Sequence, residues 1–335
     1  MNKKYLFAVS IIAGIIALWL ILKAIPILKI IDLFNHANTT HIVLYILVSN
    51  LIMIALAWRW QIILKSQKIN VSIFKLFLYR LVGYGISYLT PSAKLGGEPV
   101  RAALLSRDGI DFSRGLSTVV IDKTIEIATS ALFFFLGVLI MLFVYALPGN
   151  TGIMLLLSAI IFLTLMGWIY HRMISGKGFI VSACKSLKLH KIKSLKIDEE
   201  KLENFEKMVI KFFQEDKKDF YMTILASFIG WILMFFEFKF AGLIIGINLS
   251  FEQIFLVVSF LGVALMFPIP MGLGSMELSQ VTVFSIIGLD KAGGVAISFL
   301  VRTRDLIWSV IGLLLLSYYG LNIKKTIKKS YKLKS

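Results

Sequence analysis

The chain has 335 residues, 58% of them hydrophobic, and its mean hydropathy is +0.84. This composition is typical of an integral membrane protein, and no stretch between the apolar runs is long enough to fold around a soluble core of its own. The formal net charge of +17 suits contact with anionic lipid, although basic cytoplasmic loops alone produce much of such a value. One cysteine excludes an intramolecular disulfide, and the four histidines are scattered, so we expect no metal and no cofactor.

Six apolar segments are predicted to cross the membrane: 5–25, 41–58, 117–146, 151–170, 219–246 and 295–318. The first begins after two lysines, as a signal peptide does. It is close to the ~20 residues of a spanning helix and no small-residue cleavage pattern follows it, so we expect a retained span. Cationic residues precede the first span and follow the second, where Arg59, Lys65 and Lys68 lie. They also fill 171–218 and the tail, which predicts both termini on the cytoplasmic side.

Two further regions, 72–108 and 251–289, are too polar or too broken to hold two full spans each. Each contains an apolar helix, a break with proline, and a short second helix. The breaks fall at Thr90-Pro91 and at 268–272, because proline removes a backbone donor and clashes with the preceding turn. We expect two re-entrant helical hairpins, which membranes tolerate only where the irregular backbone is buried in protein or lines a cavity.

The second half of the chain repeats the first. A gapless shift of 179 residues carries Pro91 onto Pro270, Glu98 onto Glu277, Gly109 onto Gly288, Asp111 onto Asp290, Lys123 onto Arg302 and Glu126 onto Asp305. We interpret this as an internal duplication. Three predicted crossings separate the two repeat starts, so the repeats are expected to be inverted. The predicted fold is an all-α polytopic membrane protein with about six spanning helices and two re-entrant hairpins arranged as inverted repeats.

We expect one membrane domain over 1–335. Its parts are the first span and outer loop (1–40), repeat 1 (41–146), the fourth span with a basic linker (147–218), repeat 2 (219–319) and a basic tail (320–335). The linker contains a predicted amphipathic helix after Asp198. Two interpretations stay open for it: a helix lying on anionic lipid, or one packing on the cytoplasmic face of the protein.

Ionisable residues inside the hairpins and their flanking helices are the candidate site. A charge at mid-bilayer costs about 2.5–3.5 kcal/mol on insertion scales, so such groups must pair, reach the headgroups or line a wet cavity. The candidate substrate-binding residues are Lys94, Glu98, Arg101, Lys123, Glu126, Glu277, Arg302 and Asp305. We identify no catalytic set and no metal ligands among them.

The first hairpin carries the most cationic part of this set. Glu98 and Arg101 share a helix face, and Lys94 lies where that helix begins, which favours an anion site suited to a phosphate headgroup. The alternative is that Glu98 and Arg101 only neutralise each other. Arg80, in the same hairpin, is a candidate for snorkelling to the interface.

The second hairpin has fewer cations. Glu277 either faces the site or pairs with Arg302 or Arg304. The pairs Lys123–Glu126 and Arg302–Asp305 either steer a headgroup or lock the hairpins by salt bridges. Glu237 and Lys239 point to opposite faces of one helix, so we expect at least one of them to reach the polar centre.

Pro91, Gly97-Glu98 and Arg101, with their counterparts Pro270, 272–274 and Glu277, resemble the lysylphosphatidylglycerol synthase transmembrane-region family of flippase-like membrane proteins. The resemblance covers nearly the whole chain. It implies a prokaryotic cytoplasmic membrane protein in which Glu98, Arg101 and Glu277 are polar hairpin positions. The chain reads Pro-Met-Gly at 270–272 where the family often has Pro-Gly-Gly. It has no region resembling the soluble aminoacyltransferase domain of full-length synthases, so lysyl transfer from tRNA is not expected.

The sequence thus favours a flippase or scramblase for an anionic or aminoacylated phospholipid, or for a polyprenyl-phosphate-linked lipid. Two alternatives stay open: a membrane-embedded transferase resembling a phosphatidylglycerol lysyltransferase or a lipid-linked glycosyltransferase, and an ion-coupled carrier of a small anion. No nucleotide loop, HExxH or Asp-x-Asp motif supports an enzyme. The expected partners are membrane lipids with anionic headgroups and not nucleic acid, and a homo-oligomer is left open.

Overall fold

A computed structural model describes residues 27–35, 37–90, 95–145, 150–177, 199–265 and 267–319, with scattered positions between 12 and 25. Over these residues the regular structure is entirely helical, which confirms the predicted all-α class. The elements are α2 (Ile27–Asp32), α3 (Thr39–Ser66), α4 (Ile73–Leu89), α5 (Glu98–Arg107), α6 (Phe112–Val144), α7 (Thr151–Ile174), α9 (Glu199–Gln214), α10 (Lys217–Ile244), α11 (Phe251–Ala264), the 3-10 turn η2 (Pro270–Gly272), α12 (Ser275–Ile286) and α13 (Lys291–Tyr318).

Four helices in the described part of the chain are long and apolar enough to cross a membrane: α3, α6, α7 and α10. They correspond to four of the six predicted spans, although α6 and α10 each end two residues before the predicted limit. Helix α13 has 28 residues and covers the predicted span 295–318, but Arg302, Arg304 and Asp305 lower its apolar character. The predicted span 5–25 lies largely outside the described residues.

Both predicted helix–break–helix units are present. Helix α4 ends at Leu89 and α5 begins at Glu98, with Pro99 in its first turn, where proline is tolerated. The Nζ atom of Lys75 lies 2.5 Å from Asp108 Oδ1, so the start of α4 and the end of α5 lie together. In the second unit, α11 and α12 are joined through η2, and the Gln280 side chain of α12 donates to the carbonyl oxygen of Val257 of α11 at 3.1 Å. Each unit therefore turns back on itself as a hairpin.

The duplication extends to the secondary structure. The 179-residue shift places α3, α4, α5 and α6 over α10, α11, α12 and α13. The side chains of Asp111 and Asp290 cap α6 and α13 by accepting from backbone N–H groups of the first turn. Gly109 and Gly288, just before these caps, have φ angles of 82° and 74°, which favour glycine.

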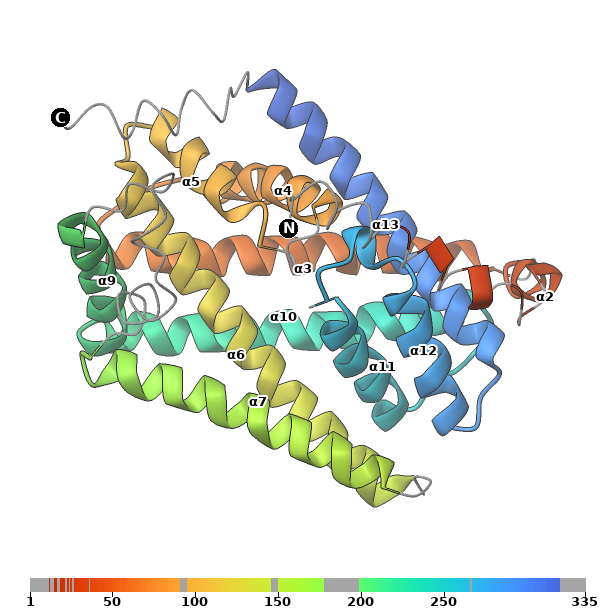
Figure 1. Cartoon of the computed structure of the whole chain (residues 1–335). Coiled ribbons are helices and arrows are strands. Elements are labelled where there is room, and N and C mark those ends of the chain that lie inside the picture. Colours follow the sequence, from red (N-terminus) through yellow and green to blue (C-terminus); the bar gives the residue numbers. More distant parts are fainter. Residues whose placement is uncertain are drawn as a thin grey trace.

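The two repeats run in opposite directions. Helices α3 and α10 lie side by side through the centre of the molecule (Figure 1). Ser49 near the start of α3 contacts Glu237 near the end of α10, whereas Arg59 near the end of α3 contacts Ser227 near the start of α10. The two helices are therefore antiparallel, which confirms inverted repeats.

The first helix of each hairpin packs on a helix of the other repeat. Helix α4 of the first repeat packs on α13 of the second, and the corresponding helix α11 packs on α6 of the first (Figure 1). At the α4–α13 contact a Cβ atom on Gly312 would lie 2.1 Å from the Leu81 carbonyl oxygen. Glycine at this position is needed for the two backbones to approach so closely.

Helix α9 is the predicted amphipathic helix, and its apolar face packs on the protein. Val209 and Phe212 are buried in a cluster with Ile63, Ile121 and Ile125 of α3 and α6. This arrangement supports the second of the two interpretations, a helix packed on the end of the bundle.

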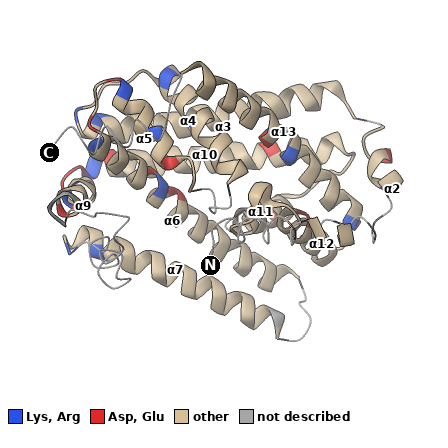
Figure 2. Ribbon diagram, turned by 45° about the horizontal axis from the view of Figure 1, so that its top comes forward, with Lys and Arg blue, Asp and Glu red and all other residues tan. Residues whose placement is uncertain are grey.

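Charged and apolar side chains divide the surface. Large apolar side chains are exposed along α7, among them Ile153, Met154, Leu157 and Ile161. Figure 2 shows few charges along α7, whereas many Lys and Arg residues lie at the end of the bundle near α9. Lys65, Lys68, Arg107 and Arg114 are exposed at the helix ends that gather there. This distribution suits a bundle surrounded by hydrocarbon with one cationic end in water.

Candidate functional site: a charged cavity between the repeats

A cavity of about 400 Å³ lies between the two repeats. Its walls come from α3, α4, α5 and α6 of the first repeat and from α10, α11 and α13 of the second. Its ionisable lining residues are Arg59, Arg80, Tyr84, Tyr88, Glu98, Arg101, Lys123, Glu126, Glu237 and Arg304. Four of the residues proposed from sequence, Glu98, Arg101, Lys123 and Glu126, are therefore brought together here.

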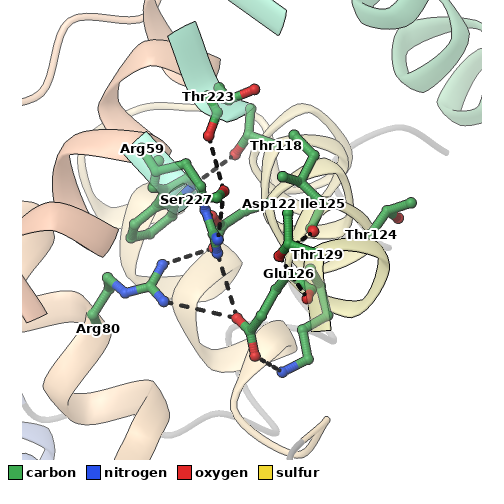
Figure 3. A network of polar contacts seen from close by, with 12 residues as sticks. Arg59, Arg80, Thr118, Asp122, Thr124, Ile125, Glu126, Thr129, Thr223 and Ser227 are labelled. Atoms are coloured by element: carbon green, nitrogen blue, oxygen red, sulfur yellow. Dashed lines mark hydrogen bonds and ion pairs between the residues drawn. The ribbon is translucent and has the colours of Figure 1, made fainter. Parts of the chain in front are cut away.

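Asp122 of α6 organises the first-repeat side of this cavity. It is fully buried, and its Oδ1 accepts from Arg59 Nε at 2.7 Å. Its Oδ2 accepts from Arg80 at 2.7 Å and from Arg101 at 2.8 Å. Figure 3 shows Arg59 and Arg80 converging on the α6 carboxylates from two other helices. Three guanidinium groups thus share one aspartate.

The approach of Arg101 depends on Gly83. A Cβ atom at position 83 would lie 2.7 Å from Arg101 Cγ and 2.9 Å from its Cδ, so only glycine leaves room for this side chain. On its other side the guanidinium carbon lies 3.9 Å from the centre of the Trp60 ring, a cation–π arrangement. The charged end of Arg101 is thereby fixed in one position at the cavity wall.

Glu126, one turn after Asp122, extends the cluster toward Lys123 and Glu98. The Lys123 ammonium donates to Glu126 at 2.7 Å, as the i,i+3 spacing predicted. Arg59 donates to the same carboxylate at 3.4 Å. Glu98 lies 3.8 Å from Lys123, while Arg101 is held by Asp122. The alternative in which Glu98 and Arg101 only neutralise each other is therefore not what the structure shows.

This first-repeat cluster carries one excess positive charge. Its cations are Arg59, Arg80, Arg101 and Lys123, and its carboxylates are Glu98, Asp122 and Glu126. Two buried polar atoms, Arg101 Nε and Glu98 Oε2, have no hydrogen-bond partner. A buried donor without a partner costs free energy that an acceptor entering the cavity would recover. Both the excess charge and the unpartnered donor suit an anionic ligand.

In the second repeat Glu277 and Arg302 form a closed pair. Arg302 donates to Glu277 through Nε at 3.2 Å and through Nη2, and to the carbonyl oxygen of Met271 at 2.9 Å. The second carboxylate oxygen accepts from the N–H of Gly274 at 2.9 Å. Glu277 is fully buried. Glu277 and Arg302 hold the turn before α12, and neither lines the cavity.

Arg304, two residues after the counterpart of Lys123, binds two carboxylates. It donates to Asp305 Oδ1 at 2.8 and 3.0 Å and to Glu237 Oε1. Glu237 is fully buried and faces the cavity, which confirms that one of the two charged residues of α10 reaches the polar centre. The expected pairing of Arg302 with Asp305 is replaced by two pairs, Arg302–Glu277 and Arg304–Asp305.

Three members of the site are not among the residues that the sequence predicts for it. Arg59 was assigned to the basic loop after the second span, which is wrong because α3 continues to Ser66 and Arg59 is 1% exposed. Snorkelling by Arg80 is also wrong, since it is buried on Asp122. Asp122 is absent from the predicted site residues, although its i,i+4 spacing to Glu126 is a usable signal. Lys94 lies outside the described residues, and within those residues no three Asp, Glu, His or Cys side chains gather in a way suited to a metal ion.

A family model described as "Lysylphosphatidylglycerol synthase TM region" matches residues 6–312. The chain belongs to this family. A UPF0104 membrane protein of Pyrococcus horikoshii, PH1989, is 28% identical over 321 residues, covering 90% of this chain and 92% of that protein. A UPF0104 membrane protein of Methanothermobacter thermautotrophicus is 24% identical over 347 residues, covering 97% and 98%. No solved structure matches the chain.

The family and the relatives agree on the class of protein. Family membership was predicted from the hairpin motifs, and the family model extends over both of them. The similar UPF0104 protein MJ1595 of Methanocaldococcus jannaschii, 26% identical over 318 residues, is also named as a membrane protein. The chain is therefore an integral membrane protein of this family, with its charged cavity between inverted repeats.

Proposed function

We propose that the protein moves an anionic lipid headgroup between the leaflets of a prokaryotic cytoplasmic membrane, as a flippase or scramblase. The observation that carries this proposal is the excess positive charge of the first-repeat cluster at a cavity between inverted repeats. Arg101 supplies a buried, unpartnered N–H group at its wall. The family description supports a role connected with lipid.

The charge of the cluster favours a phosphodiester headgroup. Such a group carries one negative charge, which matches the single excess cation, and its oxygens accept from guanidinium groups in charge-assisted hydrogen bonds. The cavity volume of about 400 Å³ lies in the usual range for small-molecule sites, roughly 300–1,000 Å³. It is sufficient for a headgroup, so the acyl chains would stay in the surrounding hydrocarbon.

The repeat architecture supplies a route across the membrane. In transporters built from inverted repeats, the substrate site lies near mid-membrane between the repeats, and broken helices form part of it. Here Gly97, at the end of the first break, and Leu265, at the end of α11, line the cavity together with residues of the antiparallel α3–α10 pair. We further propose that the cationic end near α9 faces the cytoplasm, with both termini on that side, because exposed Lys and Arg gather there.

The proposal is tested in proteoliposomes that contain a fluorescent anionic phospholipid. A quencher added outside removes the fluorescence of the outer leaflet, and the rate at which further label becomes quenched measures the exchange between leaflets. We expect Arg101→Gln to lose most of the exchange that the wild type supports. Arg101→Lys keeps the charge but not the planar fork and should retain an intermediate rate. Arg107→Gln, which removes an exposed cation from the same helix, is the matched control and should behave as wild type.

Two results would contradict the proposal. Undiminished exchange in a folded Arg101→Gln protein would show that the cluster does not receive the headgroup. Uptake of labelled inorganic phosphate into sealed vesicles without any lipid exchange would show a carrier for a small soluble anion instead. Retention of fold is checked by the melting temperature and by gel filtration in detergent.

A further inference from the structure

The tip of the second hairpin, residues 270–274, is fastened to α13 by one arginine. Arg302 uses all three nitrogens of its guanidinium there. Nε and Nη2 donate to Glu277, and Nη1 donates to the carbonyl oxygen of Met271 at 2.9 Å. The other carboxylate oxygen of Glu277 accepts from the N–H of Gly274. A single set of bonds therefore connects both ends of the turn to the long helix behind it.

The backbone of this tip is strained. Met271 has a φ of 57°, a left-handed conformation that residues with a side chain disfavour. Gly272 and Gly274 have φ angles of 59° and 75°, which glycine adopts freely. A strained residue persists only where its surroundings hold it, and the bond from Arg302 to the Met271 carbonyl oxygen does so here. Once that bond opens, Met271 can relax and the tip can pivot at the two glycines.

The tip lies at the wall of the cavity that the second hairpin covers. The turn η2, which forms the first half of the tip, packs on α4 of the first hairpin. Tyr84 and Tyr88 of α4 line the cavity, and so do Leu261 and Leu265, which come shortly before the tip in the chain. The packing of the tip on α4 therefore joins the two hairpins at this wall.

The cavity reaches the surface beside the first hairpin and is covered beside the second. Among the described lining residues only Leu95, just before α5, is exposed, at 47%. Of the lining residues of α11, Val258 and Leu261 are each 5% exposed. The opening thus lies beside Glu98 and Lys123, whose charged groups are 3.8 Å apart. The covered wall lies beside their counterparts in the second repeat, which are bound to each other directly.

We infer that the tip 270–274 is a gate, that the bonds of Arg302 are its latch, and that opening of the gate admits the headgroup on the side of the second hairpin. The first repeat shows that the fold accepts a pair without a latch, since Lys123 donates to Glu126 and only approaches Glu98. In transporters with inverted repeats, one repeat moves against the other around a fixed site. The passage of a headgroup rests on the proposed function, whereas the latch does not.

The latch is tested by alkylation of a buried cysteine in the purified full-length protein in detergent. In a Cys184→Ser background, Met276→Cys places a thiol under the tip, where the native side chain is 0% exposed and lies against Gly272. Leu104→Cys, equally buried in α5, reports unfolding of the whole bundle. The rate of reaction with N-ethylmaleimide at Met276→Cys, divided by that at Leu104→Cys, therefore measures opening of the tip.

We expect Arg302→Gln to raise this ratio at least about tenfold, which corresponds to about 1.4 kcal/mol. Glutamine lacks the planar fork that binds Glu277 and the Met271 carbonyl oxygen together. Lys123→Gln, at the equivalent position of the first repeat, is the matched control and should leave the ratio unchanged. Met271→Gly, which keeps the latch and removes the strain of the closed tip, should lower the ratio severalfold. If Arg302→Gln does not fold, Met271→Gly decides alone. An unchanged ratio would overturn the inference.

The link to lipid is tested by the exchange assay in proteoliposomes. Met271→Gly keeps the gate closed for a larger share of the time, so exchange of the fluorescent anionic phospholipid should slow severalfold. If the alkylation ratio falls while exchange keeps the wild-type rate, the gate is not on the path of the lipid, and that half of the inference fails while the proposed function stands. If the wild type moves no lipid at all, the proposed function fails, and the alkylation ratio alone decides the latch.

Discussion

Glu98 lies 3.8 Å from Lys123, and the 179-residue shift that relates the repeats carries this pair onto Glu277 and Arg302. The same ion pair therefore occurs twice, in two states. In the second repeat it is closed, because Arg302 also binds the carbonyl oxygen of Met271 and Glu277 binds the N–H of Gly274. In the first repeat the pair is open: Glu98 and Lys123 are farther apart, and both side chains line the cavity.

The closed pair should contribute more to stability than the open one. Arg302→Gln leaves the fully buried Glu277 without its cation, which typically costs about 3–5 kcal/mol. Lys123→Gln leaves Glu126 with Arg59, and should cost clearly less. Melting temperatures in detergent, measured by intrinsic fluorescence, check the order. An equal loss in the two variants would contradict the view that the duplicated pairs differ in closure.

Asp122 should be the least replaceable residue of the first-repeat cluster. Asp122→Asn leaves three guanidinium groups facing a neutral amide, and we expect a loss of about 3–5 kcal/mol or failure to fold. Arg80→Gln alone should cost less, because Arg59 and Arg101 still hold the carboxylate. The double variant Asp122→Asn, Arg80→Gln should be less destabilised than the two single losses added together, since the groups share one network. Additive losses would show that Arg80 and Asp122 act independently.

The fold could be predicted from sequence further than the site could. The fold leaves local signals in the sequence: the proline breaks, the glycines with positive φ, and the repeated Glu98 and Glu277. Because of the duplication, such signals occur twice at the same spacing and are easier to recognise. Arg59 shows the limit: a hydropathy reading ends the span before it, yet α3 continues for about two turns. Its partner Asp122 lies 63 residues away, and only the packing of α3 on α6 makes a buried arginine acceptable there. No local pattern contains that contact.

The aspartates that cap the helix after each hairpin, Asp111 and Asp290, are a second pair of residues related by the duplication. The Asp111 side chain accepts from the N–H groups of Ser113 and Arg114, and Asp290 accepts from that of Ala292. Replacing either by Ala should cost about 0.5–2 kcal/mol. Asp290 also forms an exposed ion pair with Lys29, and the loss of that ion pair in Asp290→Ala adds at most about 1 kcal/mol to the cost. Thermal melts of the two variants check these values.

The cap at Asp290 also predicts a dependence on pH. Hydrogen bonds from Lys29 and from the backbone of Ala292 lower the pKa of Asp290 below its ordinary value. A lowered pKa in the folded state means that the stabilisation is present at neutral pH and is lost as the pH falls through that value. The difference in melting temperature between wild type and Asp290→Asn should therefore shrink below about pH 4, near the unfolded pKa of aspartate. A difference that grows on acidification would contradict this account.

The duplication supplies an internal control for the position of Arg101. A methyl group added at Gly83 would meet the Arg101 side chain, whereas one added at its counterpart Gly262 would meet nothing within 4 Å. Overpacking of this kind typically costs about 1–3 kcal/mol, so Gly83→Ala should lower the melting temperature clearly and Gly262→Ala should not. Gly83→Ala should also slow lipid exchange, because it moves the guanidinium away from Asp122 and Trp60. A Gly83→Ala protein as stable and as active as wild type would show that the tight passage of Arg101 over this glycine is not needed.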